Sequence, residues 1–190
     1  MGRRTLHDAH GYGYLTFQEV VSKSSNIGMA ILGQRMGNGK LYEAVRAFGF
    51  GQRSGVDLRG EAPGIVLPLK RWTDYSTMSI PMGQEIACTS LQLANAFAAL
   101  ANEGQLLKPR IFRGAIDENG LLIDERIEPE LINQAVTPEI ARTMVLDVLR
   151  LTVTSGTGKR ADVPGYQVFG KTGTAQIAKS TGGGKGHYEE

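Results

Sequence analysis

The stretch "LTFQEVVSKSSNIGMAILGQRMG", residues 15–37, decides how the N-terminal half folds, because its helical spacing of apolar residues is interrupted in the middle. The interruption is Ser24–Asn26, and Ser and Asn side chains compete for the backbone hydrogen bonds of a helix interior. We therefore predict two helices rather than one. The second helix is capped by Ser25 or Asn26 and runs to about Met36.

Two capping boxes mark the starts of predicted helices. Thr16 with Glu19 is the first, since a Thr followed three residues later by Glu can satisfy two free backbone N–H groups. Thr89 with Gln92 is the second, and it opens an Ala- and Leu-rich helix of about 14 residues that Gly104 stops. Because this second helix is apolar on most faces, we expect it to lie in a core.

The remaining elements indicate an α+β fold. Helices are predicted over 40–48 and 137–153, and the second of these opens with a Thr N-cap and Pro at its first position. A β-hairpin is predicted over 109–124, and residues 165–179 show the alternation of a strand. Helices dominate the first 150 residues and strand patterns come late, which favours α+β over alternating α/β.

Composition excludes several classes of function. The formal net charge is +2 and no Lys/Arg run carries interleaved aromatic residues, so we expect no nucleic-acid partner. Cys88 is the single cysteine, which excludes an intrachain disulfide and Cys-ligated zinc. No apolar stretch of 18 residues exists, so this chain contains no membrane span. His7 and His10 could share a metal, but a plain pair of loop histidines is the simpler interpretation, and we predict no metal and no cofactor.

The stretch "FGKTGTAQ", residues 169–176, carries groups that suit a carboxylate. On a strand, Thr172 and Thr174 lie on one side, and Gly173 leaves room for a close backbone approach. Two hydroxyls, free N–H groups and the Lys171 cation would together bind a substrate carboxylate laid along the strand. The alternative is a strand end with a solvated lysine.

Two motifs in this order point to one family. Ser24-x-Asn26 and Lys171–Gly173, about 145 residues apart, match two of the three active-site motifs of penicillin-binding proteins. The surrounding sequence resembles the monofunctional (class B) peptidoglycan D,D-transpeptidases over nearly the whole chain. The segments that carry this resemblance, in the family's order, are "LTFQEVVSKSSNIGMAILGQRMG", "LYEAVRAFGFGQRSGVDLRGE", "TSLQLANAFAALANEG" and "GKTGTAQ".

The resemblance implies the fold and the reaction. The fold would be part of the penicillin-binding (β-lactamase-like) transpeptidase fold, mainly its helical subdomain with the Lys-Thr-Gly strand. A serine would attack the penultimate D-Ala carbonyl of a peptidoglycan stem peptide, expel the last D-Ala and leave an acyl-enzyme that an amine of a second strand resolves. Ser24 would relay protons to and from the departing nitrogen. Asn26 would hold the lysine of the nucleophile motif and the substrate amide.

The same resemblance assigns roles to the C-terminal motif. Lys171 would supply positive potential for Ser24 and for the substrate's terminal carboxylate. Thr172 and Thr174 would bind that carboxylate along the strand that Gly173 keeps open, and the Thr174 backbone N–H would form half of the oxyanion hole. β-Lactams, which resemble D-Ala-D-Ala, would occupy the same groove.

One feature departs from the family pattern. No lysine of this chain has a serine three residues before it, so the family's Ser-x-x-Lys nucleophile is not in the sequence. We therefore expect residues 1–190 to be a partial transpeptidase domain that lacks the upstream nucleophile segment and the last sheet strands, with a flexible tail at 179–190. The parent would be extracytoplasmic, on the periplasmic face of the inner membrane, and anchored there by an N-terminal transmembrane helix absent here.

Two other interpretations remain at this point. A penicillin-binding module can act as a non-catalytic β-lactam sensor or as a scaffold, and sensors keep the same motifs; the class B segments favour the synthase. Partners of the parent would include other cell-wall synthesis or division proteins. The stretch "TSGTGKR", residues 154–160, resembles a phosphate loop, but Val153 and Arg160 occupy positions where that loop needs Gly and Ser or Thr.

Overall fold

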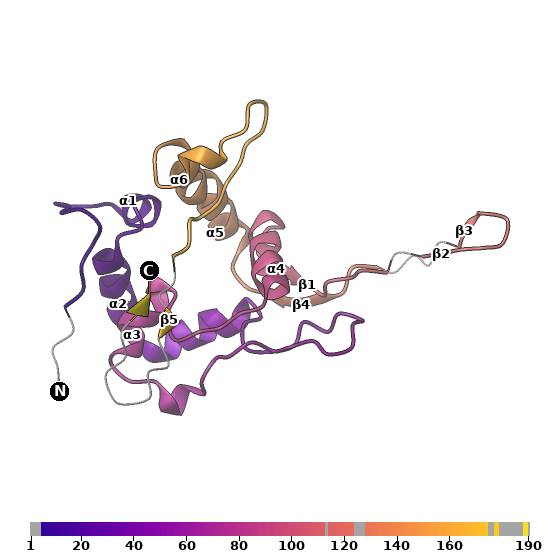
Figure 1. The fold of residues 1–190 in the computed structure, drawn as a ribbon, viewed down its shortest axis with the longest axis horizontal. Coiled ribbons are helices and arrows are strands. Elements are labelled where there is room, and N and C mark those ends of the chain that lie inside the picture. Colours follow the sequence, from indigo (N-terminus) through magenta and orange to yellow (C-terminus); the bar gives the residue numbers. More distant parts are fainter. Residues whose placement is uncertain (1–4, 113, 124–127, 175–176, 179–187, 190) are drawn as a thin grey trace.

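The computed structural model describes residues 5–112, 114–123, 128–174, 177–178 and 188–189. These residues form a mixed helical and β structure, as predicted, in which helices dominate (Figure 1). The helices are α1 (Phe17–Ser22), α2 (Asn26–Ala47), α3 (Ser76–Ser79), α4 (Ser90–Ala101), α5 (Pro138–Thr143) and α6 (Arg150–Thr154). Short 3-10 helices are η1 (Leu69–Arg71), η2 (Ile80–Met82) and η4 (Lys159–Ala161), and η3 (Met144–Leu149) is a π-helix.

The strands are short and pair only in twos among the described residues. They are β1 (Gln105–Leu107), β2 (Ala115–Ile116), β3 (Leu122–Ile123), β4 (Leu131–Gln134), β5 (Ile177–Ala178) and β6 (Tyr188–Glu189). All three pairs, β1–β4, β2–β3 and β5–β6, are antiparallel. The β2–β3 pair is the hairpin predicted at 109–124, and Figure 1 shows it extending away from the helices.

The N-terminal helices begin where their capping residues predict. Thr16 and Glu19 form the complete capping box of α1. The Ser25 hydroxyl accepts from the Gly28 N–H and so caps α2, which confirms the predicted break between two helices. Within α2 the backbone leaves helical geometry at Gly37 (φ 76°, ψ 162°), directly after the predicted helix end at Met36. Gly tolerates this positive φ, so the chain kinks there and continues as the helix predicted from residue 40.

The C-terminal helical stretch is continuous but not uniform. Thr137 caps α5 as predicted, and the helix passes through the π-helix η3 into α6. The prediction of a strand over 165–179 was wrong for most of its length. The described residues 165–174 form no strand, and within this range only Ile177–Ala178, β5, is one. Alternation alone does not make a strand, because a strand needs a neighbouring chain for its N–H and C=O groups.

The core is formed mainly by helices that pack on one another and on strand β1. α1 packs on η3 and α6, α2 packs on α3 and η2, and α4 packs on β1 and α5. α4 begins with the predicted Thr89–Gln92 capping box and buries Gln92, Ala96 and Ala99. The expectation that it lies in a core is only partly met, because Leu93 and Ala94 on its other side are exposed. The buried apolar side chains are Val20, Ala30, Leu41, Val56, Ile80, Ala96, Ala99, Leu106, Ala141, Val148, Leu149 and Val153.

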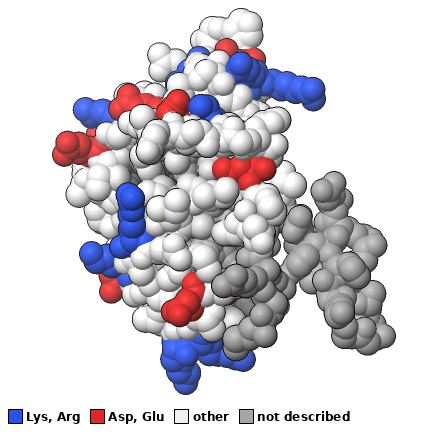
Figure 2. Space-filling model, turned by 90° about the vertical axis from the view of Figure 1, so that its left-hand side faces the viewer, with Lys and Arg blue, Asp and Glu red and all other residues white. Residues whose placement is uncertain are grey.

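The surface carries charges of both signs. On the face seen in Figure 2, which is the left-hand side of Figure 1, Lys and Arg side chains are interspersed with Asp and Glu and separated by uncharged residues. Of the tail predicted to be flexible at 179–190, residues 179–187 and 190 lie outside the described residues, and Tyr188–Glu189 form β6.

The packing of α2 on α3 predicts opposite effects for two glycines of one helix. A Cβ at buried Gly33 would overlap the Thr77 carbonyl oxygen, whereas a Cβ at Gly39 would meet nothing within 4 Å. Gly33→Ala should therefore lower the free energy of unfolding by about 1–3 kcal/mol. Gly39→Ala should raise it by about 0.5–1 kcal/mol, because Ala is the better helix former.

Urea unfolding followed by circular dichroism measures both substitutions against the unchanged chain. Equal effects of the two substitutions would contradict the close α2–α3 approach.

Candidate active site

The turn between α1 and α2 presents one serine and buries two others. Ser22 and Ser25 are buried, whereas Ser24 is exposed. Ser24 has a left-handed backbone (φ 57°), which is uncommon for a residue other than glycine and reverses the chain between the helices. The turn is held by backbone hydrogen bonds from Ser24 N to Val21 O (3.1 Å) and from Ser25 N to Val20 O (2.9 Å).

Lys171 lies directly against this turn. Its ammonium Nζ donates to Ser24 Oγ at 2.8 Å and to its neighbour's carbonyl, Thr172 O, at 2.9 Å. The third contact is longer, 3.4 Å to Thr172 Oγ1. An ammonium has three donors, so these three oxygens account for all of them. The structure therefore joins the two motifs that the sequence analysis singled out.

The residues just before Lys171 are fixed on the helices. The Phe169 ring stacks on Phe97 of α4, with ring centroids 6.5 Å apart and planes at 29°. Arg150, at the start of α6, donates to Val168 O at 2.8 Å and pairs with Asp162 at 3.0 Å. Gly170 N donates to Leu149 O at 3.4 Å. These contacts position the segment that carries Lys171 without a strand ladder.

Asn26 is placed beside the turn but is not joined to Lys171. It is the exposed first residue of α2, and its Nδ2 donates to His7 O at 3.3 Å. Asp8 adds a second cap to the same helix end, since Oδ2 accepts from Ser25 Oγ (2.7 Å) and Oδ1 accepts from Ile27 N (3.1 Å). The acidic cap also complements the positive end of the helix dipole. Asp8 escaped the sequence analysis because its partners lie 17 and 19 residues away.

The three residues after Lys171 form the open side of the site. Thr172, Gly173 and Thr174 are all exposed. A Cβ at Gly173 would meet nothing within 4 Å, so the backbone there is accessible to a ligand. The Thr172 hydroxyl is 2.7 Å from the hydroxyl of Thr157, a residue that the sequence analysis did not assign to the site.

Thr157 belongs to the stretch 154–160, considered above for phosphate. It lies in the turn after α6, beside the Lys171 segment, and its backbone N donates to Ser22 O at 3.1 Å. The two glycines around it, Gly156 and Gly158, mark a tight turn in the sequence. The two glycines predict the turn but not its contact with Ser22, which lies far away in the sequence.

Burial changes the acid–base behaviour of the lysine. Lys171 is half-buried between the α1–α2 turn and residue 172. Desolvation disfavours the charged form, so burial lowers the pKa of Lys171 below its ordinary range. The hydrogen bond to Ser24 thus comes from an ammonium that gives up its proton more readily than a solvated lysine.

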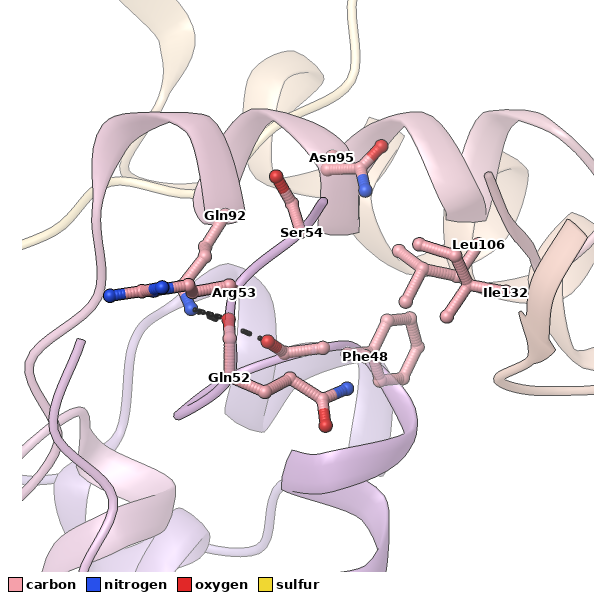
Figure 3. Close-up of a pocket in the computed structure, with 9 residues that line it drawn as sticks. Phe48, Gln52, Arg53, Ser54, Gln92, Asn95, Leu106 and Ile132 are labelled. Atoms are coloured by element: carbon pink, nitrogen blue, oxygen red, sulfur yellow. Dashed lines mark hydrogen bonds between the residues drawn. The ribbon is translucent and has the colours of Figure 1, made fainter. Parts of the chain in front are cut away.

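A small pocket lies away from this site and has a structural explanation. It is lined by residues of α4, β1, β4 and the loop after α2 (Figure 3). The buried amide of Gln92 donates to the carbonyl oxygens of Gln52 and Pro63, each at 2.8 Å. Three chain segments are thereby tied together, and Figure 3 shows the first of these bonds as a dashed line. The pocket contains none of the residues predicted for the site.

The part of the chain that the structure describes has neither a cluster of metal-ligating side chains nor a membrane-spanning helix. No group of three or more His, Cys, Asp or Glu side chains there is arranged to hold a metal ion. None of the described helices combines the length and the apolar character that crossing a bilayer would require.

The helical framework and the contact between the Ser-x-Asn and Lys-Thr-Gly motifs agree with the resemblance to penicillin-binding protein transpeptidases drawn from the sequence. The chain belongs to the family described as the penicillin binding protein transpeptidase domain, which matches residues 4–190. It is 40% identical over 184 residues to penicillin-binding protein PbpB of Mycolicibacterium smegmatis, covering 93% of this chain and 28% of that protein. It is 30% identical over 172 residues to peptidoglycan D,D-transpeptidase FtsI of Escherichia coli, covering 90% and 27%.

Solved structures agree with this assignment. Penicillin binding protein 3 from Mycobacterium tuberculosis superposes with a TM-score of 0.84 at 38% identity, over 97% of this chain and 42% of that one. The same protein complexed with aztreonam and with ampicillin gives the same score. The resemblance to class B transpeptidases and the fold class are thereby confirmed. The chain spans less than a third of the length of the curated relatives it matches.

Because Lys171 is half-buried, we expect it to lose its proton at a lower pH than a solvated lysine. In the 190-residue chain labelled with [ε-¹³C]lysine, Lys171 should lose its proton at a lower pH than Lys108, whose pKa the Glu130 carboxylate raises. Because burial lowers the folded pKa, the unfolded chain takes up this proton at a higher pH. The contribution of neutral Lys171 to folding stability is therefore lost as the pH falls through the interval between the two pKa values.

NMR titration, with the resonance assigned by Lys171→Arg, measures the folded pKa. If Lys171 and Lys108 titrate together, the proposed desolvation is wrong.

Proposed function

We propose that this chain forms part of a serine D,D-transpeptidase that cross-links peptidoglycan. The observation that carries the proposal is the 2.8 Å hydrogen bond from Lys171 Nζ to Ser24 Oγ, since it unites two motifs of the family's active site. Family membership and relatives named as peptidoglycan D,D-transpeptidases support the same reaction. The nucleophilic serine is proposed to lie in a Ser-x-x-Lys segment of the longer protein, outside these 190 residues.

In the proposed reaction the nucleophile's Oγ gives up its proton as it bonds to the penultimate D-Ala carbonyl carbon of a stem peptide, and this proton becomes available to the leaving nitrogen. The C–N bond then breaks, and the nitrogen leaves with the terminal D-Ala after receiving a proton. Ser24 passes that proton, because its exposed hydroxyl is held at the site by Lys171. The amine of a second peptidoglycan strand attacks the acyl-enzyme, gives up a proton by the same route and releases the serine.

The open side of the site binds the substrate in this proposal. Lys171 provides positive potential for the terminal carboxylate, and the exposed hydroxyls of Thr172 and Thr174 donate to it. Gly173 leaves the backbone accessible, and Thr174 N–H forms half of the oxyanion hole. Asn26, at the start of α2, holds the lysine of the nucleophile motif and the substrate amide.

The proposal extends to inhibitors and to the cellular setting. β-Lactams occupy the stem-peptide groove, as the aztreonam and ampicillin complexes of the mycobacterial protein support. Cross-linking of the cell wall places the domain outside the cytoplasm, and the longer protein would be held at the inner membrane by a segment outside this chain. Its protein partners would be other components of cell-wall synthesis or division.

The chain as given should not form an acyl-enzyme, because no Ser-x-x-Lys occurs in it. Incubation with a fluorescent penicillin, followed by denaturing electrophoresis, should leave the 190-residue chain unlabelled, while the full-length protein that carries the segment is labelled. A stoichiometric serine adduct on the 190-residue chain would contradict the assignment of the nucleophile to another segment.

In the full-length protein, Ser24→Ala should slow acylation by penicillin roughly 10²–10⁴-fold, the usual effect of removing a general acid or base. Lys171→Ala should also slow it, because both the carboxylate-binding charge and the contact to Ser24 are lost. Ser90→Ala and Lys70→Ala, at exposed positions outside the site, serve as matched controls.

Stopped-flow measurement of the acylation rate tests all four substitutions. If Ser24→Ala and Lys171→Ala acylate at rates within threefold of the control rates, Ser24 and Lys171 have no role in acylation and the α1–α2 turn only caps a helix. Normal acylation together with a failure to cross-link stem peptides would instead identify a β-lactam sensor.

A further inference from the structure

We propose that Thr157 is a positioning residue of this active site, which holds the Ser24 turn with its backbone and the Lys171 segment with its hydroxyl. The inference rests on the proposed function for its kinetic consequence, but its structural part concerns residues of this chain alone. Thr157 would touch neither substrate nor nucleophile in this role. It would fix the distance between the two groups that do.

Two hydrogen bonds carry the proposal. Thr157 N donates to Ser22 O at 3.1 Å, and its Oγ1 lies 2.7 Å from Thr172 Oγ1. Thr172 is bonded to Lys171 through the chain, and Lys171 Nζ returns to Ser24 at 2.8 Å. The contacts therefore form a closed ring that spans both walls of the site. Within that ring, Thr157 is the member that contacts one wall with its backbone and the other with its side chain.

The turn that carries Thr157 is itself rigid. Gly156 N donates to Leu151 O at 3.0 Å, and Gly158 N donates to Thr152 O at 2.9 Å, so the end of α6 fixes both sides of the threonine. Thr152 is fully buried. A Cβ at Gly156 would overlap Ser22 O, which shows how closely the turn approaches the α1–α2 turn. A hydroxyl on such a turn has a fixed place from which to hold Thr172.

The contact between the Thr157 and Thr172 hydroxyls also affects how well Lys171 is solvated. Thr172 Oγ1 is 3.4 Å from Lys171 Nζ, so the rotamer of Thr172 affects how much water reaches the ammonium. Without the Thr157 hydroxyl, Thr172 loses the shorter of the two contacts of its hydroxyl, water takes that place, and Lys171 becomes better solvated. Better solvation favours the charged form, so the pKa of Lys171 should rise toward its ordinary value.

The test compares Thr157→Val, Thr157→Ser and Thr154→Val. Val keeps the shape of Thr and the backbone bond to Ser22 but removes the hydroxyl, whereas Ser retains it. Thr154→Val makes the same chemical change on an exposed threonine whose hydroxyl donates to Arg150 O of its own helix, so it is the matched control.

The first measurement is the NMR titration of Lys171 in the 190-residue chain. Thr157→Val should raise the pKa of Lys171, and Thr157→Ser and Thr154→Val should leave it unchanged. This readout needs no nucleophile and therefore decides the structural part even if the proposed transpeptidase activity fails. An unchanged pKa in Thr157→Val would overturn the proposal, and so would loss of folding, since an exposed hydroxyl that only positions Thr172 is not required to fold.

The second measurement is the acylation of the full-length protein by penicillin as a function of pH. Loss of one hydrogen bond should slow acylation about three- to tenfold in Thr157→Val. The alkaline limb of the pH–rate profile of Thr157→Val should move to higher pH, because Lys171 then stays charged to a higher pH. Thr157→Ser should have the acylation rate and the alkaline limb of the unchanged protein. A rate and a limb equal to those of Thr154→Val would overturn the kinetic part. Absence of acylation in the unchanged full-length protein would contradict the proposed function instead.

Discussion

The hydrogen bond from Lys171 to Ser24 joins residues 147 positions apart, and it forms only because the rest of the fold brings the two residues together. Closing so long a loop has a large entropic cost, which a single exposed hydrogen bond cannot offset. The intervening chain must therefore already be folded so that the two residues meet. The Phe97–Phe169 stack and the Arg150 bond to Val168 O do this for Lys171, and the α1–α2 turn does it for Ser24.

The sequence predicted best the features whose partners lie within three or four residues. The Thr16 and Thr89 capping boxes and the Ser25 cap are confirmed, because each side chain bonds a backbone group of its own first helical turn. The kink at Gly37 follows equally from a residue that tolerates a positive φ. The family resemblance then supplied the association of Ser24 with Lys171, which no local pattern could have provided.

The features that escaped prediction depend on partners far along the chain. The β1–β4 pair joins residues near 106 to residues near 133, and neither short segment has a pattern that names the other. The alternation over 165–179 implied a strand ladder, and the described residues 165–174 form no strand. Thr157 has a local turn pattern, yet its two partners, Ser22 and Thr172, come from opposite ends of the sequence.

The direction of the Ser24–Lys171 hydrogen bond bears on the chemistry of the proposed site. An ammonium can only donate, so when Lys171 is charged the Ser24 oxygen must be the acceptor. The hydroxyl hydrogen of Ser24 is then available to another acceptor, and Ser24 is exposed toward solvent. The buried Ser25, by contrast, donates its hydroxyl hydrogen to Asp8 and accepts from the Gly28 N–H at the start of α2. The small polar residues between α1 and α2 thus divide two tasks: Ser25 stabilises the helix start, while Ser24 keeps a hydroxyl hydrogen that, in the proposed reaction, can be passed to the departing nitrogen.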